Sequence, residues 1–283
     1  MKTPKRIEPL LEEGLVDEVI RQLMSGKEAE VYVVRCGEEV RCAKVYKEAS
    51  KRSFRQSVQY TEGRKVKNSR RARAMEKGSR YGRQEQEQAW QNAEVDALHR
   101  LAAAGVRVPT PYNFLEGVLL MELVTDANGN AAPRLNDLEL SEAQAREYHG
   151  ALVMQVVRML CAGIIHGDLS EYNVLMGRDG PVIIDLPQAI DAAGNNSAES
   201  MLLRDVGNLT AWFGRFAAEL RSTDYGREIW SIYKSGKLHP ETALTGRFEQ
   251  STKAADVGGV IREIDEVKKE EAARRRYRQA MEG

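Results

Sequence analysis

The chain has 283 residues, of which 42% are hydrophobic and 30% charged, and its formal net charge at pH 7 is zero. This composition is typical of a soluble globular protein and excludes a global field that would attract nucleic acid or a membrane surface. No apolar run approaches the roughly 20 residues of a membrane span, and no apolar core follows the basic start, so we expect no signal peptide. Three cysteines without a C-x-x-C pair predict reduced thiols, a cytoplasmic location and no zinc site.

The N-terminal segment has helical periodicity. Apolar side chains recur at helical spacing over residues 8–23, with acidic residues gathered on the other face. We therefore expect residues 1–24 to provide an N-terminal helix that packs on a first lobe.

Two β-rich runs follow, Ser25–Arg35 and Val40–Tyr46, with a turn between them. The segment that leads into the first run is not a Walker A loop, because that motif needs G-x-x-x-x-G-K-[ST]. It is similar instead to the loop that covers the nucleotide in protein kinases, and Lys44 in the second run is similar to their strand lysine. The residues that we expect to contact the nucleotide here are Ser25, Gly26, Lys27, Glu28, Ala29, Val31 and Lys44.

A basic segment separates these strands from the next helix. Between Arg64 and Arg83 there are nine Lys or Arg residues and a single acid. Such a run is usually solvated, so we expect a flexible insertion at about residues 60–88. Contact with RNA phosphates or the ribosome is the alternative for residues 64–83. Ser69 and Ser79 lie within the insertion and are candidate sites of phosphorylation.

The pattern at residues 86–103 predicts a helix with Trp90, Glu94 and Leu98 on one stripe. A carboxylate that faces a core is costly unless it is paired. Lys44 is the obvious partner of Glu94, and this ion pair holds the phosphate-binding lysine in kinases.

A buried strand is predicted at Val118–Val124, and it runs into a polar, Gly-containing segment. This arrangement suits a hinge between two lobes, at which an adenine edge meets backbone groups of Met121, Glu122 and Leu123. We place the first lobe at residues 25–122 and the second at 123–240. A helix is predicted over residues 141–162, as the first element of the second lobe's core.

The most informative stretch contains two apolar runs, Asn173–Met176 and Pro181–Asp185, joined by a four-residue turn with a Gly at each end. Folding this hairpin brings Asn173 and Asp185 to the same open end. Asp168, five residues before Asn173 in a tight His-Gly-Asp loop, can reach that end as well.

Two carboxylates and one amide oxygen at one place suit a hard cation such as Mg²⁺. With a nucleotide supplying further ligands, the chemistry indicated is phosphoryl transfer. Any one of Asp168, Asn173 and Asp185 alone would be read as a turn cap. The three together, in a pattern similar to the kinase H-R-D-x-x-x-x-N loop and D-F-G strand end, favour catalysis.

The rest of the chain is predicted to be mainly helical. A helix is expected over 198–220, and Asp205 within it is expected to accept hydrogen bonds from backbone amides of the His166 loop. Residues 241–283 are predicted to form a charged helical tail.

These segments together resemble the RIO family of atypical serine protein kinases, particularly its bacterial members. The resemblance covers roughly residues 20–220 and rests on Ser25-Gly-Lys-Glu-Ala29, Ala43-Lys-Val-Tyr46, Trp90 with Glu94, His166-Gly-Asp-Leu-Ser-Glu-Tyr-Asn173 and Ile183-Ile-Asp-Leu-Pro-Gln188. It implies an α+β, two-lobed protein-kinase-like fold that binds ATP with Mg²⁺ or Mn²⁺. It also implies autophosphorylation on serine, an ATPase-like cycle, or both.

The resemblance assigns roles residue by residue. Asp168 matches the catalytic residue, Asn173 and Asp185 match the metal ligands, and Lys44 with Glu94 matches the phosphate-positioning pair. Ser170 is a further expected nucleotide contact. Asp185 also matches the position at which family members form a phosphoaspartate.

Two departures from ordinary protein kinases have consequences. Gly167 stands where the loop usually has Arg, so the cation that would read a phosphate on the activation loop is missing. Only 19 residues separate Asp185 from Asp205, and no A-P-E follows, so a full activation segment cannot fit.

Two other functions remain open from the sequence. The first is a small-molecule phosphotransferase of the aminoglycoside or choline kinase type, which also uses an H-G-D loop. The second is a nucleotide-regulated module that binds RNA or the ribosome through residues 64–83.

Overall fold

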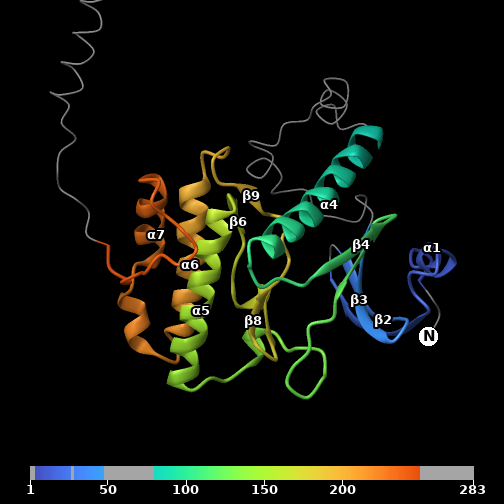
Figure 1. Cartoon of the computed structure of the whole chain (residues 1–283), viewed down its shortest axis with the longest axis horizontal. Helices are drawn as coiled ribbons and strands as arrows, with labels where there is room; N and C mark the ends of the chain where they lie inside the picture. Colours follow the sequence, from blue (N-terminus) through green and yellow to red (C-terminus); the bar gives the residue numbers. More distant parts are fainter. Residues whose placement is uncertain (1–3, 27–28, 48–79, 249–283) are drawn as a thin grey trace, which may run out of the picture. The chain divides into compact units, whose positions relative to one another are not determined.

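A computed structural model gives the structure of residues 4–26, 29–47 and 80–248, with the backbone alone described for residues 80–90. The strands come mostly from the first half of the chain and the helices from the second (Figure 1). The helices and strands are α1 Glu8–Glu12, β1 Glu18–Ser25, β2 Ala29–Cys36, β3 Glu39–Tyr46, α4 Arg80–Ala103, β4 Pro111–Leu115, β5 Val118–Glu122, η2 Leu135–Asp137, α5 Glu142–Cys161, β6 Ile164–Ile165, η3 Glu171–Asn173, β7 Val174–Gly177, β8 Gly180–Ile183, β9 Ile190–Asp191, α6 Ala198–Phe213, η4 Ala218–Ser222 and α7 Tyr225–Lys234.

The first lobe is built on a five-stranded antiparallel sheet in the order β1-β2-β3-β5-β4. Because side chains alternate across a strand, its two faces enter different cores. Val45 and Leu120 pack with Leu10 of α1 on one face. Tyr46 and Leu119 face the larger core that continues into the second lobe.

The prediction of a helix over residues 8–23 is wrong beyond Glu12. The helix ends at Glu12, because Gly14, two residues later, has a φ of +68° that does not continue a right-handed helix, and β1 begins at Glu18. The misreading has a physical cause, because Val19 and Leu23 are four residues apart and this spacing fits a helix and a strand equally. The structure places them as the two half-buried positions of the edge strand β1.

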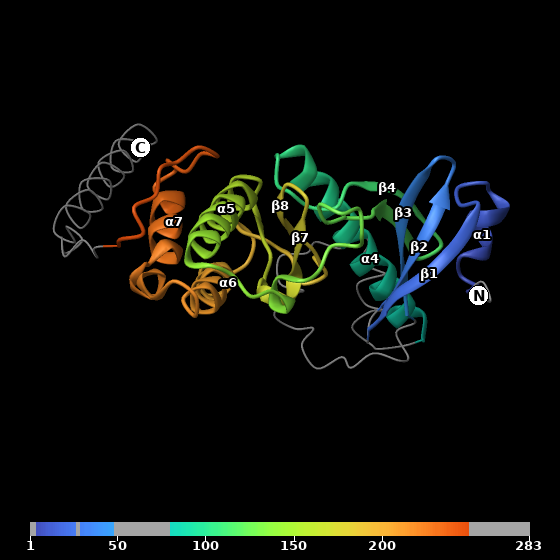
Figure 2. The same cartoon turned by 90° about the horizontal axis from the view of Figure 1, so that it is seen from below.

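The second lobe surrounds helix α5. This helix begins with a capping box in which Ser141 and Gln144 bond each other's backbone, and α6 and α7 pack against it. The hairpin β7–β8 lies between α5 and the sheet of the first lobe in both cartoon views (Figures 1 and 2). The helix predicted over 198–220 ends at Phe213, and residues 218–222 form a 3-10 turn.

His149 on α5 is buried among α6 and α7. Its ring bonds the hydroxyl of Thr210 at 3.1 Å and stacks edge-on against Phe213 and tilted against Tyr225. Burial lowers the pKa of His149 from 6.5 to about 4, because the charged form would lose its hydration.

This histidine makes stability depend on pH. As the pH is lowered from about 6.5 to 4, the unfolded chain takes up a proton at His149 that the folded chain does not. The free energy of unfolding therefore decreases as the pH is lowered through this range. The contribution is about 3 kcal/mol over that window. We expect His149→Leu to lose this part of the pH dependence in urea unfolding, whereas exposed His99→Gln keeps it. Identical pH slopes in the two variants would contradict the assignment.

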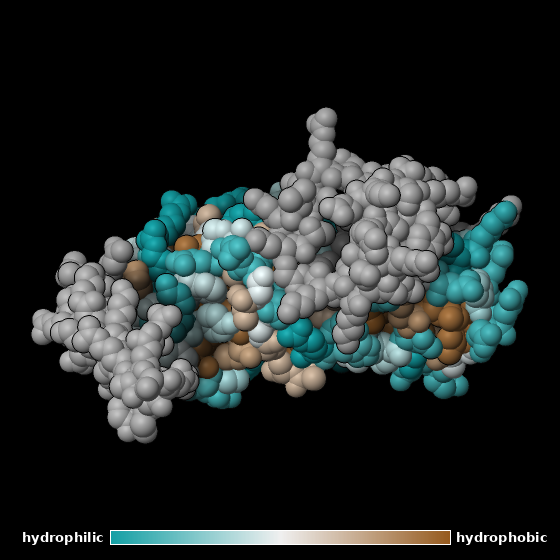
Figure 3. All heavy atoms as spheres, turned by 90° about the horizontal axis from the view of Figure 1, so that it is seen from above, coloured by the Kyte–Doolittle hydropathy of each residue, from teal (hydrophilic) through white to brown (hydrophobic). Residues whose placement is uncertain are grey.

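The surface of the described residues is mixed in character. The face drawn in Figure 3 is largely hydrophilic, with small apolar areas between the grey atoms. The large apolar side chains most exposed to solvent are Ile20, Met24, Val40, Tyr112 and Tyr172. Within the ranges that the structure covers, none of the helices has the length and apolar character needed to cross a membrane.

Candidate active site

The hairpin β7–β8 brings the predicted polar residues to one end. Met176 pairs with Pro181 and Val174 with Ile183, and the amide of Ile184 donates to the carbonyl of Asn173 at 3.0 Å. The register is the one that the sequence predicts, so Asn173 and Asp185 emerge at the same open end. Asp185 has a φ of +66°, a left-handed conformation that Asp tolerates better than most residues.

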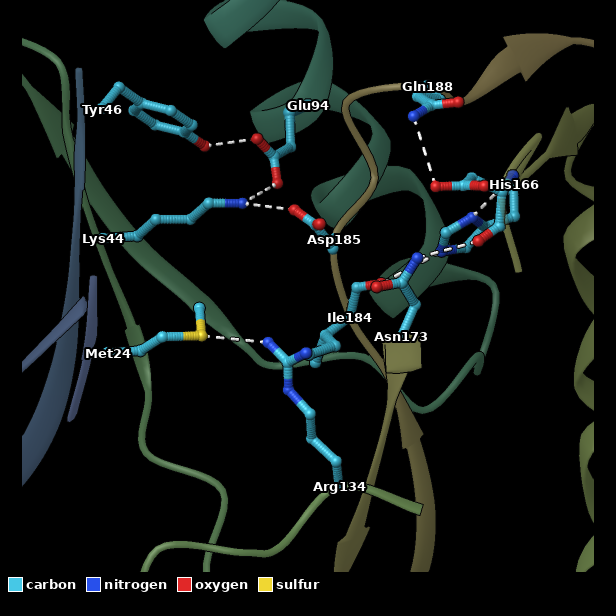
Figure 4. Close-up of polar contacts among 11 residues, drawn as sticks. Met24, Lys44, Tyr46, Glu94, Arg134, His166, Asn173, Ile184, Asp185 and Gln188 are labelled. Carbon is cyan, nitrogen blue, oxygen red and sulfur yellow. Dashed lines mark hydrogen bonds and ion pairs between the residues drawn. The ribbon is translucent and has the colours of Figure 1, made fainter. Parts of the chain in front are cut away.

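Lys44 connects this end to the first lobe. Its Nζ lies 2.7 Å from Oε1 of Glu94 and 2.9 Å from Oδ1 of Asp185 (Figure 4). The Glu94 side chain is 2% exposed, as expected for a paired carboxylate on the core stripe of α4, whereas that of Asp185 is 45% exposed. The structure thus brings together three residues from β3, α4 and the segment after β8.

The electrostatics of this cluster favour the charged forms of Lys44 and Asp185. Burial alone would lower the pKa of Lys44, but the carboxylates of Asp185 and Glu94 outweigh it and raise that pKa well above its usual value. The Lys44 ammonium in turn lowers the pKa of Asp185. A lysine that stays protonated beside a half-exposed carboxylate is suited to bind an anionic ligand that approaches from the open side.

Tyr46 is a second partner of Glu94, beside Lys44, and the sequence alone did not predict it. Its hydroxyl donates to Oε2 of Glu94 at 2.6 Å, and its side chain is fully buried. Burial, with the Glu94 charge added, raises the pKa of Tyr46 well above its usual value, so the phenol remains a donor. Both oxygens of Glu94 are therefore engaged, one by Lys44 and one by Tyr46.

We expect Tyr46→Phe to loosen the Glu94 carboxylate without opening a cavity, because only the hydroxyl is removed. The loss of one hydrogen bond to a buried charge costs about 1.5–3 kcal/mol. The free energy of unfolding is expected to fall by that amount in chemical denaturation, and catalytic turnover to fall as Lys44 loses its fixed position. A variant as stable and as active as the parent would show that Glu94 does not need this donor.

Asp168 lies in the tight loop after β6. Its side chain is exposed and accepts a hydrogen bond from Nε2 of Gln188 at 3.3 Å, and its backbone carbonyl accepts one from Nδ2 of Asn173 at 2.8 Å. Partial loss of hydration raises the pKa of Asp168, the Asp185 charge adds to this, and His166 and Arg204 oppose it. A carboxylate with a raised pKa is a better proton acceptor than an ordinary one.

Asp205 of α6 fixes the His166–Leu169 loop through hydrogen bonds to its backbone, as the sequence predicts. The amides of Gly167 and Leu169 donate to its two carboxylate oxygens at 2.8 and 3.0 Å. Gly167 has a φ of +81°, which favours glycine at the place where ordinary kinases have Arg. A guanidinium still reaches the loop, because Arg204 donates to the carbonyl of Gly167.

The segment after Asp185 is short. Residues 190–191 pair with β6, and α6 begins at Ala198. This leaves residues 186–197 where ordinary kinases have an activation segment, in agreement with the trimmed form that the sequence predicts.

The predicted nucleotide-covering loop is described in part. Lys27 and Glu28 lie outside the described residues, as does the side chain of Trp90. On either side of the gap, the amide of Gly26 donates to the carbonyl of Ala29 at 2.9 Å, and Lys47 donates to the carbonyl of Gly26 at 2.7 Å. Ser25 ends β1, where its hydroxyl bonds Glu30.

Two further predicted contacts lie at strand and loop positions that border Lys44 and Asp168. Val31 faces Lys44 in the β2–β3 register. Ser170 follows Leu169 at the entry to η3.

The predicted hinge residues occupy the end of β5. Met121 pairs with Cys42 of β3, and Leu123 follows the last strand residue. The carboxylate of Glu122 is bound by Arg107 at 2.8 Å and by the amide of Thr110 at 3.1 Å. Its own amide donates to the carbonyl of Thr110 at 2.8 Å.

The chain is similar to known proteins in sequence and in fold. The RIO domain family model matches residues 30–225. A RIO-type serine/threonine-protein kinase Rio1 from Haloferax volcanii is 33% identical over 216 residues, which are 74% of this chain and 68% of the relative. Human serine/threonine-protein kinase RIO1 is 30% identical over 225 residues, which are 79% of this chain and 37% of the relative.

The fold is also similar to a solved one. The crystal structure of the Rio2 kinase-ADP/Mg²⁺-phosphoaspartate complex from Chaetomium thermophilum has a TM-score of 0.56 and 20% identity, with 93% of this chain and 75% of that chain covered. This likeness establishes a two-lobed, protein-kinase-like α+β fold.

The fold and the family match define a protein of the kinase class. The chain belongs to the RIO family of serine/threonine-protein kinases. The curated relatives named above are archaeal and eukaryotic, so the resemblance to bacterial members stays a prediction. The chain spans about 40% of the length of the eukaryotic relatives and about two thirds of the archaeal Rio1 proteins.

Proposed function

We propose that this RIO-family kinase transfers the γ-phosphoryl group of ATP with the help of Mg²⁺ or Mn²⁺, and that the acceptor is a serine or an aspartate of its own chain, or water. The observation that carries the proposal is the ion pair of Lys44 with both Glu94 and Asp185. It places a fixed ammonium at the side of the site where phosphates would lie, next to a carboxylate that is available for a metal.

The residues present fit a divalent metal. Asn173 directs its amide nitrogen to the carbonyl of Asp168, so its oxygen is available as a ligand. Asp185 uses Oδ1 for Lys44, and its side chain is 45% exposed, so the carboxylate is accessible to a metal. Mg²⁺ favours such oxygen ligands, together with phosphate oxygens and water. When bound, the ion supplies positive charge to the phosphate groups.

Each side chain then has a defined task. Lys44, fixed by Glu94 and Tyr46, binds and orients the phosphates. Asp168 accepts the proton of the attacking hydroxyl or water as the new P–O bond forms and the bond to ADP breaks. The raised pKa of Asp168 favours this proton transfer.

The chain itself offers two kinds of acceptor. Ser69 and Ser79 are the candidate serines, and both lie outside the described residues. Asp185 is the candidate for a phosphoaspartate, because the similar Rio2 structure is a phosphoaspartate complex. Water attack on such an acyl phosphate would complete ATP hydrolysis.

The site of action is also a proposal. We infer that the protein works in the cytoplasm, from its three unpaired cysteines. Contact with RNA or the ribosome through residues 64–83 rests on their basic composition alone.

The test is incubation of the full chain with γ-labelled ATP and Mg²⁺. We expect protein-bound label, release of phosphate, or both, and loss of each when the metal is chelated. Label that hydroxylamine removes indicates an acyl phosphate, and resistant label indicates phosphoserine. Absence of both label and phosphate release, with transfer to aminoglycosides or choline instead, would replace the proposal by a small-molecule phosphotransferase.

A further inference from the structure

Arg134 lies between the hinge region and α5, in a segment that is tied to the β7–β8 hairpin. Its backbone forms an isolated bridge with Leu175, and the amide of Met176 donates to the carbonyl of Pro133 at 2.9 Å. Leu175 is two residues from Asn173, so Arg134 is anchored beside the open end of the hairpin.

The side chain of Arg134 extends to the first lobe. Its Nη2 lies 3.0 Å from the sulfur of Met24, the residue before Ser25 at the end of β1. A thioether is a weak acceptor for a guanidinium that carries five N–H donors. Among the residues that the structure describes, no carboxylate lies within ion-pair distance of Arg134. The Met24 side chain is itself 40% exposed, so the contact is at the surface of the site.

The guanidinium of Arg134 lies in the same region of the structure as the side chains of Lys44 and Asp185 (Figure 4). In Figure 4 Lys44 and Met24 extend from one side, Asp185 and Asn173 lie on the other, and the Arg134 guanidinium reaches between them.

We propose that Arg134 is a further nucleotide-binding residue, which exchanges the Met24 sulfur for the phosphate chain of ADP or ATP. The inference rests on the proposed nucleotide site. Lys44 would bind the phosphates from the side of the sheet, and Arg134 from the side of the β7–β8 hairpin.

The chemistry favours a phosphate over the other parts of the nucleotide. A guanidinium presents two parallel N–H groups that match two oxygens of a phosphate, and these charge-assisted bonds are stronger than bonds to neutral groups. Adenine and ribose offer only neutral acceptors. An arginine that has no carboxylate partner among the described residues, beside a site that already holds Lys44, is suited to bind added negative charge.

The experiment compares the binding of ADP and of adenosine by calorimetry, in the presence of a chelator and again with Mg²⁺. Arg134→Gln removes the charge and keeps most of the side-chain length. Arg178→Ala removes an exposed arginine from the turn of the same hairpin and serves as the matched control. Met24→Leu removes the present acceptor at nearly constant volume.

We expect Arg134→Gln to weaken ADP binding about tenfold to hundredfold, with adenosine binding unchanged. Arg178→Ala is expected to bind both ligands like the parent, and Met24→Leu to bind ADP at least as tightly as the parent. Retained adenosine binding shows that the Arg134→Gln protein is folded.

Three results would overturn the inference. In the first, Arg134→Gln binds ADP like the parent, which leaves the proposed function intact. In the second, ADP and adenosine weaken equally, which shows that Arg134 shapes the site without touching phosphate. In the third, Met24→Leu weakens ADP binding selectively and to the same extent, which makes the contact between Met24 and Arg134 the important one. A parent protein that binds neither ligand would instead refute the proposed nucleotide site as a whole.

Discussion

Asp168→Asn is expected to reduce phosphoryl transfer about 10²–10⁴-fold, the range typical of the loss of a general base. Nucleotide affinity is expected to stay within about twofold of the parent, since Asp168 contacts none of the groups that we propose hold the phosphates. The asparagine has the same size and keeps an oxygen for the Gln188 amide, which now lies 3.3 Å from the carboxylate. The backbone carbonyl that receives Asn173 is also unchanged.

The measurement is a single-turnover assay with labelled ATP, beside a titration of ADP. Asp179→Asn is the matched control, because Asp179 is exposed in the turn of the β7–β8 hairpin. It is expected to retain full activity. Equal rates for Asp168→Asn and the parent would remove Asp168 from the mechanism, whatever the effect on binding.

Asp185→Asn is expected to abolish the effect of Mg²⁺ on nucleotide affinity and to lower turnover about 10²-fold or more, as found when a preorganised charge-stabilising group is removed. The backbone should not change, because Asn adopts the left-handed conformation of φ +66° as readily as Asp. What is lost is the negative charge that attracts the metal and that now holds Lys44 at 2.9 Å.

ADP binding without metal is the control for the Asp185→Asn variant. Lys44 keeps its partner Glu94 at 2.7 Å, so it remains protonated and in place. Without metal, the Asp185→Asn protein is therefore expected to bind ADP as tightly as the parent or more tightly, since a carboxylate no longer competes with phosphate for Lys44. Metal-free binding that is lost together with the metal response would mean that Asp185 supports the fold and not a metal.

Local pattern was sufficient to predict the centre of this site. The turn between Met176 and Pro181 fixes the hairpin register, and the register alone brings Asn173 next to Asp185. The Lys44–Glu94 pair followed from a different argument, that a carboxylate on a core stripe needs a cation. Both inferences use constraints that act over a few residues or through the cost of burying a charge.

Contacts that depend only on tertiary approach were not predictable in this way. Arg134 and Met24 are 110 positions apart, and neither is unusual in its own segment. Tyr46 reads as an ordinary strand aromatic until α4 brings Glu94 to its hydroxyl. The strand β1 was missed for a related reason, because it is an edge strand with two register shifts and mostly exposed side chains, so its alternation is weak.

The most direct test of the account is a crystal structure with Mn²⁺ and a non-hydrolysable ATP analogue, in which the anomalous signal locates the metal. We predict one peak at about 2.1 Å from an oxygen of Asp185 and from the amide oxygen of Asn173, with Lys44 bound to the phosphates. A metal and triphosphate located away from these three side chains would contradict the central claim that they form one phosphoryl-transfer site.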